Sequence, residues 1–196
     1  IGALLIPILP QAIRSAFFLV VTFTALIIVL LLPDGYFVST QIMTYELQLL
    51  KVDQLSRVFV TIFAMAAFAG GVYAYHIKET GEQVAALLYA GSAMGVTFAG
   101  DYFTLFIFWE IMAVASTYLV WARRTDESEK AGMRYLLVHL FGGGLLLIGI
   151  LMKIGETGSI YITTLMPDGN ISSWFILAGV ALNAAVPPLH AWLPDA

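Results

Sequence analysis

The feature that most constrains this chain is a series of long apolar stretches, separated by short segments that carry charges, glycines and prolines. Each stretch approaches or exceeds the roughly 20 residues that a helix needs to cross the hydrocarbon of a bilayer. They cover residues 12–33, 58–75, 84–100, 102–122, 135–152 and 171–188. Only 11% of the residues are charged, which is too few for a soluble domain of this size. The pattern predicts an all-α, multi-pass membrane protein whose solvent is the lipid bilayer.

The apolar pattern predicts about seven transmembrane helices. We expect a partial helix at residues 1–10, followed by spans near 12–32, 54–75, 83–100, 102–122, 133–152 and 171–187. The charged stretch Arg123 to Lys130 is predicted to be a loop, and Lys153 to lie in the loop after the following span. Because the chain begins and ends abruptly within such segments, we expect it to be an N-terminal fragment of a longer protein.

One segment, near residues 40–52, has a different pattern. Met43, Tyr45, Leu47 and Leu49 alternate with more polar residues at a rough period of two, which indicates a short strand or hairpin. A strand with open edges is not tolerated in lipid. We therefore expect this segment to lie outside the hydrocarbon.

Several classes of function find no support in the sequence. The chain has no cysteine, so a thiol nucleophile or thiolate metal site is excluded. The formal net charge is −4 and Lys and Arg form no long run, which argues against nucleic-acid binding. The histidines and acids lack metal-ligand spacing, and no catalytic Ser/His/Asp order or phosphate loop is present. We expect no catalytic site and no metal site, and we give an intramembrane enzyme little weight.

Glu110 is the most informative residue, because it lies in the middle of an apolar span. It stands about 13 Å along the helix axis from Asp101 and about 20 Å from Arg123, too deep for its side chain to reach either interface. An intramembrane acid is costly and must take up a proton or find a partner, so it marks a functional site by default. The alternative is a protonated carboxyl that only joins helices by hydrogen bonding. We favour proton transfer.

His139 is predicted to lie within the next span. Imidazole ionises near neutral pH and suits a proton relay, but a neutral histidine bonded to a neighbouring helix is an equally good explanation. The run Gly142–Gly143–Gly144 follows it. Small residues let helices approach closely, so this run indicates helix packing rather than a phosphate loop.

The last span is predicted to break at Pro187–Pro188. Because Pro187 and Pro188 lack an N–H, the carbonyls of Asn183 and Ala184 lose their helical partners. Freed carbonyls at membrane depth are tolerated beside protein or a water-filled cavity, and broken helices mark ion sites in transporters. A helix that simply ends at its loop is the alternative. His190 follows the break, either at the interface or in a cavity.

Two motifs together resemble a known family. Residues 100–112, Gly-Asp-Tyr-Phe-Thr-Leu-Phe-Ile-Phe-Trp-Glu-Ile-Met, and residues 187–196, Pro-Pro-Leu-His-Ala-Trp-Leu-Pro-Asp-Ala, are similar to the signatures of antiporter-like subunits. These subunits occur in respiratory complex I, Mrp-type Na+/H+ antiporters and membrane-bound hydrogenases. The resemblance covers essentially the whole chain, including residues 51–56 after the strand-like segment, and the opening at Gly100–Asp101 looks more like the D-type component of Mrp antiporters.

The resemblance implies a subunit of about fourteen helices with two inverted repeats. Residues 1–75 would be N-terminal helices, and residues 76–196 an incomplete first repeat. The family's essential glutamate falls on Glu110. Its broken seventh helix carries a lysine seven residues before the histidine of the second motif, and that position is Asn183 here. An amide cannot titrate, so His139, a bridging water or a lysine from a missing part would have to replace the lysine.

The resemblance also implies a role without a cofactor, beside other membrane subunits in an Mrp-like or complex I-like assembly. The leading hypothesis is a proton- or monovalent cation-translocating subunit in the cell inner (plasma) membrane. In it Glu110 and His139 carry protons, and Asn183, Pro187, Pro188 and His190 shape a hydrated path. The chain would have no catalytic site of its own, although its complex could be NADH-quinone oxidoreductase-like or a hydrogenase. The rival hypothesis is a structural membrane subunit that has lost the lysine.

Overall fold

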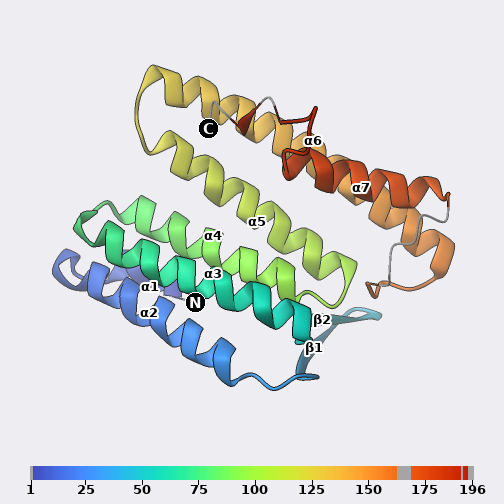
Figure 1. The fold of residues 1–196 in the computed structure, drawn as a ribbon, viewed down its shortest axis with the longest axis horizontal. Helices are drawn as coiled ribbons and strands as arrows, with labels where there is room; N and C mark the ends of the chain where they lie inside the picture. The colour runs from blue at the N-terminus through green and yellow to red at the C-terminus, as the bar shows by residue number, and fades with distance from the viewer. Residues whose placement is uncertain (1, 163–168, 191, 194–196) are drawn as a thin grey trace. The chain divides into compact units, whose positions relative to one another are not determined.

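A computed structural model describes residues 2–162, 169–190 and 192–193 of the chain. The chain forms two compact units, Ile1–Ala99 and Gly100–Ala196. Figure 1 shows the helices of both units and the hairpin between α2 and α3. The predicted division after residue 75 concerns a repeat of the longer family fold rather than compactness, and it stays a prediction.

The first unit is a group of helices that pack around two small apolar clusters. A short helix α1 (Gly2–Leu5) and a 3-10 turn η1 (Ile6–Ile8) precede α2 (Gln11–Leu31). After the hairpin come α3 (Gln54–Tyr73), a second 3-10 turn η2 (Ala74–His76) and α4 (Thr80–Phe98). One cluster contains Ala3, Ile6, Phe18 and Leu87, and the other contains Val29, Val52, Val60 and Phe98.

The segment predicted to contain a short strand or hairpin forms a hairpin, and its position outside the hydrocarbon stays a prediction. Strands β1 (Phe37–Ile42) and β2 (Tyr45–Lys51) pair antiparallel. The turn between them is short, and Met43 adopts a φ of 54° there. The pairing begins at Phe37 rather than near residue 40, and the register shifts at a bulge between Val38 and Ser39.

The second unit consists of three helices, α5 (Tyr102–Trp121), α6 (Asp126–Thr157) and α7 (Ile171–Asn183). Helix α6 packs against both α5 and α7. Asp101 caps α5 through the backbone N–H of Thr104, at 2.8 Å. A backbone pairing beside it joins the start of α5 to the segment after α6, with Tyr102 N 2.9 Å from Ile160 O.

Helix α6 corrects two predictions. The charged stretch predicted as a loop is largely helical, because Thr125 and Ser128 form a capping box that starts α6 at Asp126. At 32 residues the helix is about 48 Å long, far longer than the predicted span 133–152. Lys153 therefore lies inside the helix, where it is only 6% exposed, rather than in a loop.

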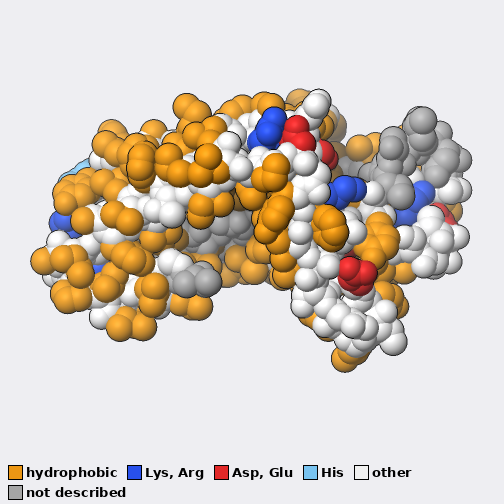
Figure 2. Space-filling model, turned by 90° about the horizontal axis from the view of Figure 1, so that it is seen from below, with side chains coloured by type: hydrophobic (Ala, Val, Ile, Leu, Met, Phe, Trp, Pro, Cys, Tyr) orange, Lys and Arg blue, Asp and Glu red, His pale blue; other side chains and the backbone are white. Residues whose placement is uncertain are grey.

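Among the described helices, four are long and apolar enough to cross a membrane: α2, α3 with η2, α5 and α6. Helix α4 is not among them, and α7 has 13 residues. The predicted count of about seven transmembrane helices is therefore not confirmed. Apolar side chains nevertheless cover much of the face shown in Figure 2, as expected for helices that face lipid.

Helix α7 ends earlier than the predicted span 171–187. Its last residue is Asn183, and Ala185 then adopts a left-handed φ of 53°. Pro187 follows within one turn and has no N–H for the carbonyl of Asn183. The helix therefore ends at Asn183, before the two prolines and short of the predicted residue 187, and a break in a longer helix stays a prediction.

Candidate functional site

Glu110 lies on α5 and faces the glycines of α6. Its Oε1 atom stands against Gly143 so closely that a Cβ on that residue would overlap it. Oε1 is buried and has no hydrogen-bond partner within the described structure. The close packing thus depends on glycine at position 143, and it leaves a carboxyl oxygen unsatisfied in an apolar setting.

Asn183 reaches the same stretch of α6 from the other side. Its Oδ1 atom lies against Gly142, where a Cβ would also overlap it, and Nδ2 would lie 3.2 Å from that Cβ. Both Oδ1 and Nδ2 are buried and have no partner among the described residues. Asn183 is also the last residue of α7. The last residue of α7 therefore places its buried side-chain amide against α6.

The glycine run has two roles in the structure. Gly142 and Gly143 make room for the side chains of Asn183 and Glu110, whereas a Cβ at Gly144 would meet nothing within 4 Å. Farther along the helix pair, a Cβ on Gly179 of α7 would stand 2.7 Å from the carbonyl oxygen of Gly142. The close helix packing predicted for the glycine run is seen at Gly142. Gly142 and Gly143 also contact the polar side chains of Asn183 and Glu110.

His139 belongs to the same face of α6, one turn before Gly143. It is 6% exposed, and its Nδ1 atom lies 2.9 Å from the carbonyl oxygen of Tyr135. Its ring stacks on the Tyr135 ring, with centroids 3.9 Å apart. Glu110 of α5 and Asn183 of α7 thus lie against residues four and three positions after His139 on α6.

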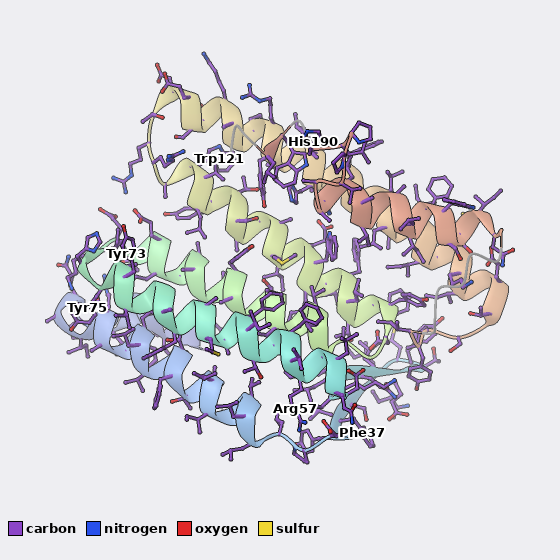
Figure 3. All side chains as sticks on the ribbon, viewed as in Figure 1. Phe37, Arg57, Tyr73, Tyr75, Trp121 and His190 are labelled. Carbon is purple, nitrogen blue, oxygen red and sulfur yellow. The ribbon has the colours of Figure 1, made fainter. Side chains whose placement is uncertain are left out.

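The residues after the break are not brought into this site. Pro187, Pro188 and His190 are exposed, and Figure 3 shows His190 on the segment that follows α7. Part of the second sequence motif, at Ala191 and from Pro194 onward, lies outside the described residues. Of the four residues predicted to shape a hydrated path, Asn183 alone lines the buried site.

Two residues near α6 were not predicted as site residues. Trp192 packs edge-on against His139, with ring centroids 4.7 Å apart; its sequence signal was only an aromatic residue near the membrane interface. Lys153 is buried at the other end of α6, with Nζ 3.5 Å from Ser173 Oγ on α7. Its position beside an apolar span made it look like a loop residue, and only the length of α6 shows otherwise.

The site has few groups that could hold a metal or a cofactor. Among the described residues, no group of three or more His, Asp or Glu side chains stands close enough to hold a metal ion. What the arrangement offers is one carboxyl, one amide and one imidazole on a helix face built with glycine. The carboxyl and the imidazole can take up or release a proton, and the amide can donate and accept hydrogen bonds.

Comparisons with known proteins identify relatives of this chain. The family described as "NADH:quinone oxidoreductase/Mrp antiporter, TM" matches residues 99–196, which is nearly the second compact unit. Hydrogenase-4 component B of Escherichia coli (strain K12) is 29% identical over 160 residues, covering 75% of this chain and 24% of that protein. NADH-quinone oxidoreductase subunit N of Desulforudis audaxviator is 29% identical over 180 residues, covering 84% of this chain and 36% of that protein.

Solved structures share the fold. A chain of the membrane-bound sulfane sulfur reductase, an archaeal respiratory membrane complex, matches with a TM-score of 0.84 and 22% identity over 99% of this chain and 45% of that chain. A chain of the Mrp complex from Dietzia sp. DQ12-45-1b matches with a TM-score of 0.79 and 24% identity over 99% of this chain and 41% of that chain.

This chain thus spans between about a quarter and under half of the length of the relatives named here. The family match itself covers half of the 196 residues and contains Glu110, His139 and Asn183. The chain is an antiporter-like membrane protein that belongs to the NADH:quinone oxidoreductase/Mrp antiporter transmembrane family.

Proposed function

We propose that this chain is part of a proton-translocating subunit, and that Glu110 is its proton-carrying group. The observation that carries the proposal is the buried, unpaired Oε1 atom of Glu110 against Gly143. A carboxylate in such a place is costly unless it takes up a proton or finds a partner, so its protonation depends on its surroundings and it can serve as a proton site. A structural carboxyl would be expected to find a fixed hydrogen-bond partner, and Glu110 Oε1 has none within the described structure.

Asn183 would serve this path by binding water rather than by titrating. Its amide has a donor and an acceptor atom that are both buried and unpaired among the described residues. A water molecule both donates and accepts hydrogen bonds, so it can bond to a carboxyl oxygen and to both polar atoms of the Asn183 amide. The lysine that the resemblance implies at position 183 could only donate hydrogen bonds. After α7, Pro187 and Pro188 offer no N–H to the carbonyls of Asn183 and Ala184, which leaves these carbonyls able to bind water.

His139 would be the next group in the relay. It lies one turn from Gly143 on the same buried face of α6 as the glycines that Glu110 and Asn183 contact. A proton passing between Glu110 and His139 would travel along one helix face. Pro187, Pro188 and His190 would line the outer, exposed part of the path.

The relatives support a place for this chain in a multisubunit membrane complex. The Mrp complex, respiratory complex I from Thermus thermophilus and the archaeal sulfane sulfur reductase all contain a chain of this fold. By analogy with these, the protein would work beside other membrane subunits in the inner (plasma) membrane. A role like that of the D-type Mrp component, with Na+ as a second ion, is the finer version of the proposal, and a proton-pumping subunit of a complex I-like or hydrogenase-like assembly is its alternative.

A structural membrane subunit is the second candidate, and one observation favours it. Asn183 cannot change its charge, so the pair that the family resemblance implies is incomplete here. In that case Glu110 would join α5 to α6 as a permanently protonated group. Its loss would disturb assembly, and it would leave transport by the assembled complex unchanged.

The two candidates are separated by measuring assembly and transport in the same variants. The assembled complex in proteoliposomes is compared for the wild type, Glu110→Gln, Glu110→Asp and, as a control, Glu127→Gln, because Glu127 is an exposed residue at the start of α6. We expect Glu110→Gln to assemble and to lose about a hundredfold or more of its proton transport. Glu110→Asp should retain part of the activity, and Glu127→Gln all of it. Wild-type transport in Glu110→Gln would reject the proton-carrier role.

A further inference from the structure

His139 is enclosed by two aromatic side chains from different parts of the second unit. The Tyr135 ring lies parallel to it, with an interplanar angle of 15° and centroids 3.9 Å apart. The Trp192 ring meets it edge-on, at 76° and 4.7 Å. Trp192 also meets Tyr135 edge-on, at 89° and 5.1 Å. The three rings form a closed cluster, which we call the His139 cage.

One hydrogen bond within the cage determines which tautomer the neutral imidazole adopts. A carbonyl oxygen only accepts, so the 2.9 Å contact with the Tyr135 carbonyl places a hydrogen on His139 Nδ1. In the neutral ring Nε2 then holds the free lone pair, and a proton taken up by His139 must bind there. Anything that changes access to Nε2 changes the ability of His139 to take up a proton.

Tyr135 is itself held in place from α5. Its hydroxyl donates to Ser116 Oγ at 2.9 Å, and Ser116 in turn donates to the backbone carbonyl of Met112 at 2.8 Å. Ser116 lies on the helix that carries Glu110, between the glutamate and the end of α5. The Tyr135 side of the cage is therefore fixed between two packed helices.

Trp192 holds the other side of the cage from the broken end of α7. Its indole Nε1 donates to the carbonyl oxygen of Leu182 at 3.1 Å. Leu182 directly precedes Asn183, the last residue of α7, and the same carbonyl accepts from the N–H of Ala185 at 3.2 Å. The Trp192 side chain thus links the Leu182 carbonyl near the end of α7 to the His139 ring.

We propose that Trp192 is a positioning residue for His139. Its hydrogen bond to the end of α7 holds the indole against the imidazole, where the indole acts as a cover that limits the access of water. Through the bond to Leu182, a shift of the helix end at Asn183 moves Trp192 and changes the access of water to His139 Nε2. Trp192 does not itself carry the proton. Its part in translocation rests on the proposed function of Glu110 and His139, whereas its role as a cover does not.

The test measures how fast diethylpyrocarbonate modifies each histidine of the full protein in membrane vesicles. The reaction is run at about pH 8, where an ordinary imidazole is neutral, and is resolved by peptide mass spectrometry. His76 is exposed and lies in the first unit, so it serves as the internal reference. The variants are Trp192→Ala, Trp192→Phe and, as a matched control, Trp174→Ala, because Trp174 lies on α7 with 60% of its surface exposed.

We expect Trp192→Ala to raise the rate at His139 about fivefold or more relative to His76, and Trp174→Ala to leave it unchanged. Trp192→Phe keeps an aromatic ring but loses the bond to Leu182, so it should give a smaller rise. If the Trp192→Ala protein does not insert into the membrane, the Trp192→Phe protein decides the question. A faster modification of His139 in Trp192→Phe supports the cover, and a modification rate equal to that of the wild type overturns it. Equal rates in Trp192→Ala and Trp174→Ala overturn it as well.

Transport separates the cover from its role in translocation. If Trp192 positions His139 for the relay, the variant with the faster reaction at His139 should also transport more slowly, and Trp192→Phe should recover part of the loss. A faster reaction at His139 together with wild-type transport would overturn the positioning role. Because the modification rate is independent of transport, a failure of the proposed function at Glu110 would be recognised separately.

Discussion

Glu110 of α5 and Asn183 of α7 contact two successive residues of the helix between them, Gly143 and Gly142. Both side chains have buried polar atoms without hydrogen-bond partners among the described residues. The arrangement requires glycine at both positions, because a larger residue would displace the Glu110 carboxyl or the Asn183 amide. Substitutions at these glycines and at the two polar residues therefore report on the site.

The first prediction concerns the space in front of Glu110. Gly143→Ala places a methyl group where Glu110 Oε1 lies, so it should displace the carboxyl, lower the free energy of unfolding by about 1–3 kcal/mol and reduce proton transport. Gly144→Ala is the matched control, because its Cβ would meet nothing within 4 Å. Alanine favours a helix over glycine by about 1 kcal/mol, so this variant should be as stable as the wild type or more so. Thermal melting and transport are measured for both, and similar behaviour of the two would contradict the site.

The second prediction separates stability from function at Asn183. Asn183→Leu removes a buried amide that has no partner within the described structure, so the variant loses no hydrogen bond to another described residue. It should therefore melt close to the wild-type temperature, while its transport falls because the path loses a group that binds water. A variant that transports normally would show that the amide is not part of the path.

How far the site could be predicted follows from the type of signal in the sequence. Glu110 was found because an acid in an apolar span is conspicuous without any structure. Asn183 is indicated by two signals, because Pro187 frees its carbonyl and because the resemblance places the family's lysine at that position. The contact of both residues with neighbouring glycines could not be predicted, because the rotation of three helices about their axes determines it. Trp192 was missed as a neighbour of His139 for the same reason, since the chain must first turn back after α7.

The helices could be predicted from the length of the apolar stretches, whereas the residues at which the helices begin and end were harder to predict. The hairpin near residues 40–52 was predicted from a local pattern. The two prolines predicted an interruption near residue 187, whereas α7 ends at Asn183. The start of α6 was not, because the cap formed by Thr125 and Ser128 lies within a charged stretch that looks like a loop. Lys153 was misplaced because its burial depends on packing against α7, which the sequence does not display.

The third prediction concerns acid stability at the start of α3. Asp53 caps this helix, and its carboxylate accepts the N–H of Ser56 at 2.7 Å. This bond, together with those from the Ser56 hydroxyl and the Leu55 N–H and the charge of Lys51, holds the pKa of Asp53 below its ordinary value of 3.8 despite partial burial. A lowered pKa in the folded state means that the stabilisation is present above about pH 4. It is lost as the pH falls through the lower, folded-state value.

The matched variant for this prediction is Asp53→Asn, because asparagine caps a helix about as well as aspartate and does not titrate. At neutral pH the two proteins should melt at similar temperatures. Below about pH 4 the wild type should lose stability relative to the variant. Melting curves in detergent at a series of pH values provide the measurement, and a difference that does not change with pH would show that the cap does not depend on the charge.

The fourth prediction is the central one, that Glu110 changes its protonation while the protein works. Infrared difference spectroscopy of the reconstituted complex detects the carbonyl stretch of a protonated carboxyl group directly. During turnover the wild type should show a carboxyl band that disappears in Glu110→Gln and persists in Glu127→Gln. A turnover-dependent band of unchanged size in Glu110→Gln would contradict the account, because the proton would then be carried by a different residue.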